Sequence, residues 1–142
     1  MFAAPRRVRF RELEPGIPLE GVRDALREIR SLVEASGRTV SFSVEKRASA
    51  AGDLWLSMAW GRSTGWIPVH RYAREDPGEC SRAVEVALRG YGGRPHWGRV
   101  HHQGVDSLAG SYPRFADSLA LRDRFDPDRV VANDHLERVL GR

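Results

Sequence analysis

The fold predicted for this chain depends on the twelve residues YGGRPHWGRVHH, residues 91–102. They follow a segment, residues 80–91, whose apolar residues recur at helical spacing, and Gly92 and Gly93 form a natural end for that helix. If residues 96–102 are extended, the chain runs strand, helix, strand, strand, helix, strand. That order is the split β-α-β arrangement of ferredoxin-like domains. We therefore predict an α+β fold, an antiparallel sheet with helices on one face.

The preceding segments supply the other elements of this order. Alternation at Val8 and Phe10 predicts the first strand, which EPGIP (residues 14–18) is expected to break. Apolar residues at helical spacing predict a helix over residues 21–36. Alternation predicts a second strand over residues 40–47 and a third over residues 66–72, where Pro68 favours a sheet edge or a bulge.

Two regions outside this order are less regular. Residues 54–60, LWLSMAW, fit either a short helix or a loop that lines a site. After the opening stretch we expect a helix that opens near Tyr112 or Pro113 and a turn at DPD, residues 126–128. A final short helix should have Asn133 or Asp134 as its N-cap.

Composition restricts the class of protein. A chain of 142 residues with 41% hydrophobic and 30% charged residues fits one globular domain, and no apolar run reaches the length of a membrane span. The single cysteine, Cys80, excludes an internal disulfide framework, and the N-terminal residues show no secretion signal, so we expect a cytoplasmic protein. The net charge of +4 comes from arginines interleaved with acids, which argues against a nucleic-acid partner.

Several polar residues are candidates for a site. Glu45 and Arg47 are two residues apart, so on a strand they leave the same face, either as a surface ion pair or as a polar clamp on a hydroxyl-rich substrate. His70 shares a strand face with Trp66 and Tyr72, and a strand histidine is more often packed and hydrogen-bonded than catalytic.

The opening stretch allows three interpretations. A metal site would use His96, His101 and His102, with Cys80 as a further ligand, but these residues lack a recognised zinc spacing. A phosphate-binding loop would need its glycines before a helix rather than after one. The third interpretation is a polar and aromatic wall, in which Trp97 packs and Arg99 offers a permanent positive charge.

The segment YGGRPHWGRVH resembles the C-terminal signature G-G-R-P-H-W-G-K-x-H of the D-arabinono-1,4-lactone, L-gulonolactone and alditol oxidases. The segments VRFRELEPGIP, VSFSVEKR and YPRFADSLALRDRFDPDRVVANDHLERVLG resemble family segments in the same order. This family is of the vanillyl-alcohol-oxidase type. The resemblance implies that residues 1–142 are the substrate (cap) domain, and that FAD is held by an N-terminal domain absent from this chain. We therefore expect a fragment that needs a flavin-binding chain in trans and is inactive alone.

The resemblance also implies roles for individual residues. Glu45 and Arg47 fall on the family's E-x-R pair, which contacts substrate hydroxyls and the pyrimidine side of the flavin, and Arg99 falls on the signature's lysine. The catalytic residues implied are Glu45, Arg47 and Arg99; His70, His96 and Trp97 would bind substrate, Arg47 and Arg99 would contact the cofactor, and no metal is expected. Arg99 cannot act as a base, because a guanidinium stays protonated.

The implied reaction is oxidation of the CH–OH group of a sugar lactone or alditol, with oxygen as acceptor. Family members often associate with membranes peripherally. The alternative is a non-catalytic binding protein that retains the cap fold. If the lactone oxidase interpretation is right, Glu45, Arg47 and Arg99 should project onto one face of the sheet, close to His70.

Overall fold

The computed structural model describes residues 8–37, 44–75 and 78–142. Within them β1 (Phe10–Leu13) leads through Glu14 into β2 (Pro15–Pro18), and the later strands are β3 (Arg47–Ser49), β4 (Thr64–Trp66), β5 (Val69–Tyr72) and β6 (Arg94–Pro95). β1 pairs with β5, and the other strands form a sheet in the order β3-β4-β2-β6. All these pairings are antiparallel.

This strand order confirms the predicted fold class. β1 and β2 together occupy the place of the first predicted strand, and β4 and β5 together that of the third. The order across the sheet is then second, third, first and fourth, which is the order of a split β-α-β sheet. The break between β4 and β5 falls at Ile67 and Pro68, where the sequence predicts a bulge or an edge.

The prediction that EPGIP breaks the chain is wrong, because Pro15–Pro18 forms a central strand of the sheet. The strand tolerates its prolines where only a carbonyl is needed, and the Ile67 N–H donates to the Pro15 oxygen at 3.3 Å. Gly16 is required by close packing, since a Cβ there would lie 2.8 Å from Cγ2 of Thr64.

Among the described residues, the predicted second strand overlaps an observed strand only at Arg47. Residues 40–43 lie outside the described part of the structure, residues 44–46 belong to no strand, and β3 comprises Arg47–Ser49. Val44, which alternation places toward the core, is 39% exposed. β3 pairs with β4, with Arg47 opposite Trp66 and Ser49 opposite Thr64.

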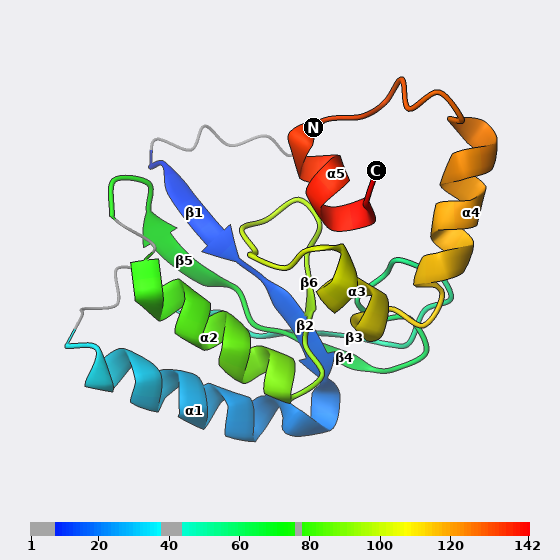
Figure 1. Ribbon diagram of the computed structural model, residues 1–142. Helices are drawn as coiled ribbons and strands as arrows, with labels where there is room; N and C mark the ends of the chain where they lie inside the picture. The colour runs from blue at the N-terminus through cyan, green and yellow to red at the C-terminus, as the bar shows by residue number, and fades with distance from the viewer. Residues whose placement is uncertain (1–7, 38–43, 76–77) are drawn as a thin grey trace, which may run out of the picture.

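Both helices predicted between the strands are confirmed. A 3-10 turn, η1 (Leu19–Gly21), leads into α1 (Val22–Ala35), and α2 (Gly78–Gly90) packs beside α1 (Figure 1). Together they cover one face of the strands. The main core lies at this contact and joins strand, α1 and α2 side chains: Leu13, Ile17, Ile67, Val22, Ala25, Ile29, Val84 and Leu88.

The C-terminal third of the chain has its own small core. α3 (Val105–Ser111), which the sequence did not predict, precedes α4 (Phe115–Phe125) and α5 (Asp134–Leu140). α4 opens slightly after the predicted start, and Asn133 caps α5 as predicted, accepting a hydrogen bond from the Leu136 N–H. The core residues here are Leu108, Tyr112, Phe115 and Val139. None of the helices in the described ranges is long and apolar enough to cross a membrane.

Candidate functional site

The segment after β6 does not continue as the predicted strand. The His96 N–H donates to the Glu14 oxygen at 3.0 Å, and the next link to the same strand runs from the Val100 N–H to the Glu12 oxygen at 2.9 Å. Four residues of this segment therefore span the distance that two residues of the neighbouring strand cover. The excess forms a bulge that lifts residues 97–99 away from the ladder and turns Arg99 toward the Glu12 and Glu14 side chains.

Most of the conspicuous residues in this stretch hold the fold together. Arg94 is buried and donates to three backbone oxygens, those of Ser111 at 2.8 Å, Met58 at 3.2 Å and Trp60 at 2.9 Å. The Trp97 indole N–H donates to the Leu56 oxygen at 2.8 Å, and its ring lies 5.1 Å from that of Tyr112. These contacts tie the loop of residues 54–60, which is not a helix here, to the C-terminal core.

Two buried carboxylates lie at the centre of the candidate site. Glu12 is 6% exposed and Glu14 is 4% exposed. They are two residues apart on an extended chain, so their side chains share one face, and Leu13 between them points into the helix-covered core. Sequence reasoning missed both. The available signal was an acid on either side of a core leucine.

Three basic side chains converge on these carboxylates. Arg99 lies 2.9 Å from Glu12 (Nη1 to Oε2) and 3.5 Å from Glu14 (Nε to Oε2). Arg47 pairs with the other oxygen of Glu14. His70, opposite Glu12 in the β1–β5 ladder, places Nε2 at 3.3 Å from Glu12 Oε1. We call these five residues the ion-pair cluster.

The structure thus brings together three of the predicted site residues, Arg47, Arg99 and His70. Glu45 is exposed and has no hydrogen bond or ion pair with the described residues. The alternation argument does not apply to it, because residues 44–46 lie outside β3. His96 is half-buried and its Nδ1 accepts the Gly98 N–H at 3.0 Å, so it shapes the bulge beside the cluster.

The cluster has a buried layer of acids and an outer, exposed layer of cations. The carboxylates are buried, whereas the Arg47 side chain is 54% exposed and that of Arg99 is 39% exposed. A guanidinium is a permanent cation with several N–H donors in a plane. Two of them held on one face can hydrogen-bond hydroxyl oxygens or stabilise negative charge that develops on a bound ligand.

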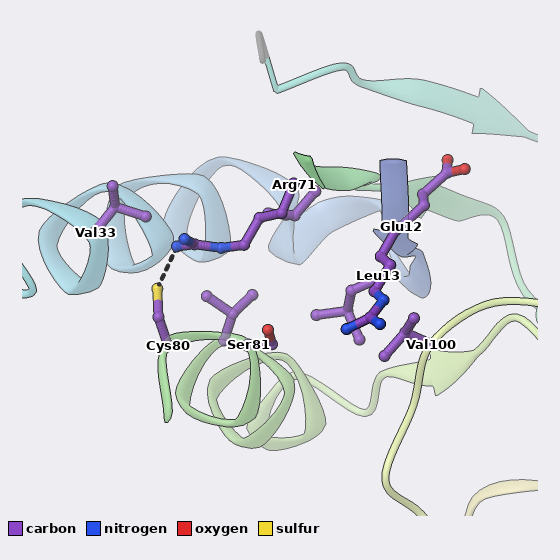
Figure 2. Close-up of a pocket in the computed structure, with 10 residues that line it drawn as sticks. Glu12, Leu13, Val33, Arg71, Cys80, Ser81 and Val100 are labelled. Carbon is purple, nitrogen blue, oxygen red and sulfur yellow. Dashed lines mark hydrogen bonds between the residues drawn. The ribbon is translucent and has the colours of Figure 1, made fainter. Parts of the chain in front are cut away.

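The opposite face of β1 leaves no room for a ligand. A cavity of about 30 Å³ lies there between β1, β5, α1 and α2, lined by residues that include Leu13, Val33 and Cys80. Figure 2 shows Arg71 crossing it to donate to Cys80 Sγ at 3.0 Å, while Glu12 points away from it. This volume holds about one water molecule.

The two adjacent histidines point to different partners. Nδ1 of His102 lies 2.7 Å from the Glu85 carboxylate on α2, whereas the buried His101 ring lies 5.8 Å from that of His135 on α5. Burial, together with the nearby Arg138 charge, lowers the pKa of His101 to about 4. Neither ring nitrogen of His101 has a hydrogen-bond partner among the described residues, and no three His, Cys, Asp or Glu side chains in that part of the chain could hold a metal ion.

The fold and the cluster define an α+β domain with two exposed guanidinium groups on the sheet face opposite the helices. Residues 1–139 match the model of the D-arabinono-1,4-lactone oxidase family, and the chain belongs to that family.

Among curated proteins, the chain is 45% identical over 141 residues to an L-gulono-1,4-lactone dehydrogenase of Mycobacterium tuberculosis, a match that covers 99% of this chain and 33% of the relative. It is 30% identical to the L-gulonolactone oxidase of Bos taurus, covering 87% of this chain and 29% of the relative. It is 32% identical to an alditol oxidase of Streptomyces, covering 82% and 28%. The chain therefore spans about a third of the length of these relatives.

Proposed function

We propose that residues 1–142 form the substrate-side (cap) domain of a FAD-dependent oxidoreductase, with FAD bound by a segment outside these residues. The reaction is oxidation of the CH–OH group of a sugar lactone, of the D-arabinono-1,4-lactone type, or of an alditol. The observation that carries the proposal is the convergence of Arg47, Arg99 and His70 on two buried carboxylates in a chain of the lactone oxidase family. The protein would act in the cytoplasm.

The residues present fit a flavin. Arg47 and Arg99 expose permanent cations on one face, and such cations suit the pyrimidine side, where a reduced flavin carries negative charge. When bound, the flavin supplies the two-electron acceptor for the hydride that leaves the substrate carbon. The buried Glu12 and Glu14 hold both guanidinium groups in place before any ligand arrives, so little reorganisation is needed on binding.

The remaining predicted residues act on the substrate. His70, oriented by Glu12, and the guanidinium donors bind hydroxyl groups, and His96 and Trp97 border the same bulge. Glu45 is the group we assign to orient or deprotonate the hydroxyl being oxidised, since a guanidinium cannot take that proton. We also propose that oxygen accepts the electrons. The names of the relatives do not decide this, because one is a dehydrogenase and another an oxidase.

Reconstitution tests this function. The purified chain should be colourless and inactive. Adding the remaining two-thirds of the Mycobacterium tuberculosis relative should give oxidation of L-gulono-1,4-lactone or an alditol, followed with oxygen and with an artificial acceptor. Arg99→Gln should lower kcat by about a hundredfold, as expected for loss of a charge that stabilises the transition state. Arg89→Gln, an exposed arginine on α2, is the matched control.

Two results would count against this function. Flavin that stays with the lone chain through gel filtration would place the cofactor site within these residues. Binding of lactone without any oxidation in the reconstituted protein would favour a non-catalytic binding protein that retains the cap fold.

A further inference from the structure

The ion-pair cluster is electrically balanced. Arg47 and Arg99 contribute two positive charges, Glu12 and Glu14 contribute two negative charges, and His70 adds a charge only when protonated. Two neighbouring guanidinium groups without acids would form a strong carboxylate-binding site, because each can donate two parallel hydrogen bonds. Here the chain itself occupies their inner donors with its own carboxylates.

This arrangement is unlike a site built to bind a free carboxylate. Burying a carboxylate costs free energy even when it is paired, and apolar residues of similar size often give equal stability. Both acids are nonetheless at least nine-tenths buried, while the arginines above them remain accessible. An incoming ligand therefore meets guanidinium N–H donors that can still stabilise charge developing next to them, while a ligand that carries a full localised negative charge is also repelled by the carboxylates beneath them.

This balance of charges can distinguish a sugar lactone from the acid formed when the lactone is hydrolysed. A 1,4-lactone is a neutral cyclic ester. Hydrolysis adds water across the ester C–O bond, opens the ring and leaves a carboxylic acid, which is ionised at neutral pH. The open form keeps the hydroxyl groups of the lactone and gains one negative charge.

We propose that Glu12 and Glu14 are specificity-determining residues that make the cluster accept neutral lactones and alditols and reject the hydrolysed carboxylate. The proposal rests on the function proposed above. Each buried acid weakens the binding of a carboxylate about 6 Å away by about a hundredfold relative to the two arginines alone, taking an effective dielectric constant of about 20. Replacing one acid by its neutral amide removes that repulsion and leaves one guanidinium charge uncompensated.

The experiment uses the purified chain and measures shifts of the arginine Nε–Hε signals by NMR at about pH 8. Wild type, Glu14→Gln and Glu85→Gln are each titrated with sodium L-gulonate and with L-gulono-1,4-lactone. Glu85 is the control: it is a buried acid like Glu14, it is 6% exposed and pairs with a histidine as Glu12 does, but it lies on α2. Glu12→Gln is a second test variant, in case Glu14→Gln does not fold.

We expect Glu14→Gln to bind gulonate about a hundredfold more tightly than wild type, with the shifts at Arg47 and Arg99, and Glu85→Gln to behave as wild type. Wild type binding gulonate as tightly as the variant would overturn the proposal, as would no gain in either Glu14→Gln or Glu12→Gln. The gulonate titrations need neither flavin nor turnover. A failure of lactone oxidation in the reconstituted protein therefore bears on the proposed function alone.

Discussion

Removing the guanidinium of Arg94 should cost the chain a large part of its stability. Arg94→Met keeps an unbranched side chain of similar length but leaves the backbone oxygens of Ser111, Met58 and Trp60 without this donor. A hydrogen bond from a charged donor contributes roughly 1.5 kcal/mol or more, so the three bonds together are worth about 5 kcal/mol. Burial, which lowers the pKa of the guanidinium, offsets part of this, and we expect a net loss of about 3 kcal/mol, as for removal of one partner from a buried charged network.

Urea unfolding followed by tryptophan fluorescence measures this loss. With a slope of about 1.5 kcal/mol per molar urea, the midpoint should fall by about 2 M. Arg89→Met, an exposed arginine at the end of α2, should leave the midpoint within experimental error. A loss below about 1 kcal/mol for Arg94→Met, or an equal loss in the control, would show that the three carbonyl bonds do not hold the loop to α3.

Three further substitutions test other contacts. His101, whose pKa is lowered to about 4, remains neutral in the folded chain while the unfolded chain takes up a proton, so stability should fall as the pH drops from about 6.5 to 4, by roughly 2 kcal/mol. His101→Phe should remove that part of the pH dependence, and an unchanged difference between pH 7 and pH 4.5 in thermal unfolding would contradict it. Gly65→Ala should lower the unfolding free energy by about 2 kcal/mol or more, because the new Cβ would lie 2.1 Å from Cγ2 of Val22; a midpoint in urea equal to wild type would refute this. Asn133→Ala should lower the unfolding free energy by about 1 kcal/mol, since the Leu136 N–H loses its acceptor at 3.0 Å. The loss of helical signal as the protein is warmed measures this change.

The helices and the order of elements could be predicted because their signals are local. α1 and α2 each carry apolar residues at helical spacing and end near glycines. The strand Pro15–Pro18 within EPGIP could not be predicted from the sequence. It depends on the close approach of Gly16 to Thr64, which is a contact between distant segments. α3 was missed for a different reason: the helix has seven residues, and its one fully buried residue, Leu108, gives too short a pattern to detect.

The site was predicted in part. Strand position singled out Arg47 and His70, the composition of the loop singled out Arg99, and the resemblance added their roles; the structure brings these three together. Glu12 and Glu14 continue the even-numbered positions of Val8 and Phe10, so alternation places them on the face predicted to be apolar and gives no sign of a buried pair of acids there. Their burial comes from the bulge, which lies over them through hydrogen bonds that no periodicity encodes.

Different residues of YGGRPHWGRVHH make structural contacts and site contacts, and this affects how a sequence match to the stretch should be interpreted. Arg94, Trp97 and His102 bind the loop, the C-terminal core and α2, whereas Arg99 alone in this stretch reaches the ion-pair cluster. A distant homologue can therefore keep nearly the whole stretch because it keeps the architecture, even after the reaction has been lost. A more discriminating test of retained chemistry is the joint presence of two acids spaced as Glu12 and Glu14 with basic residues at the positions of Arg47 and Arg99.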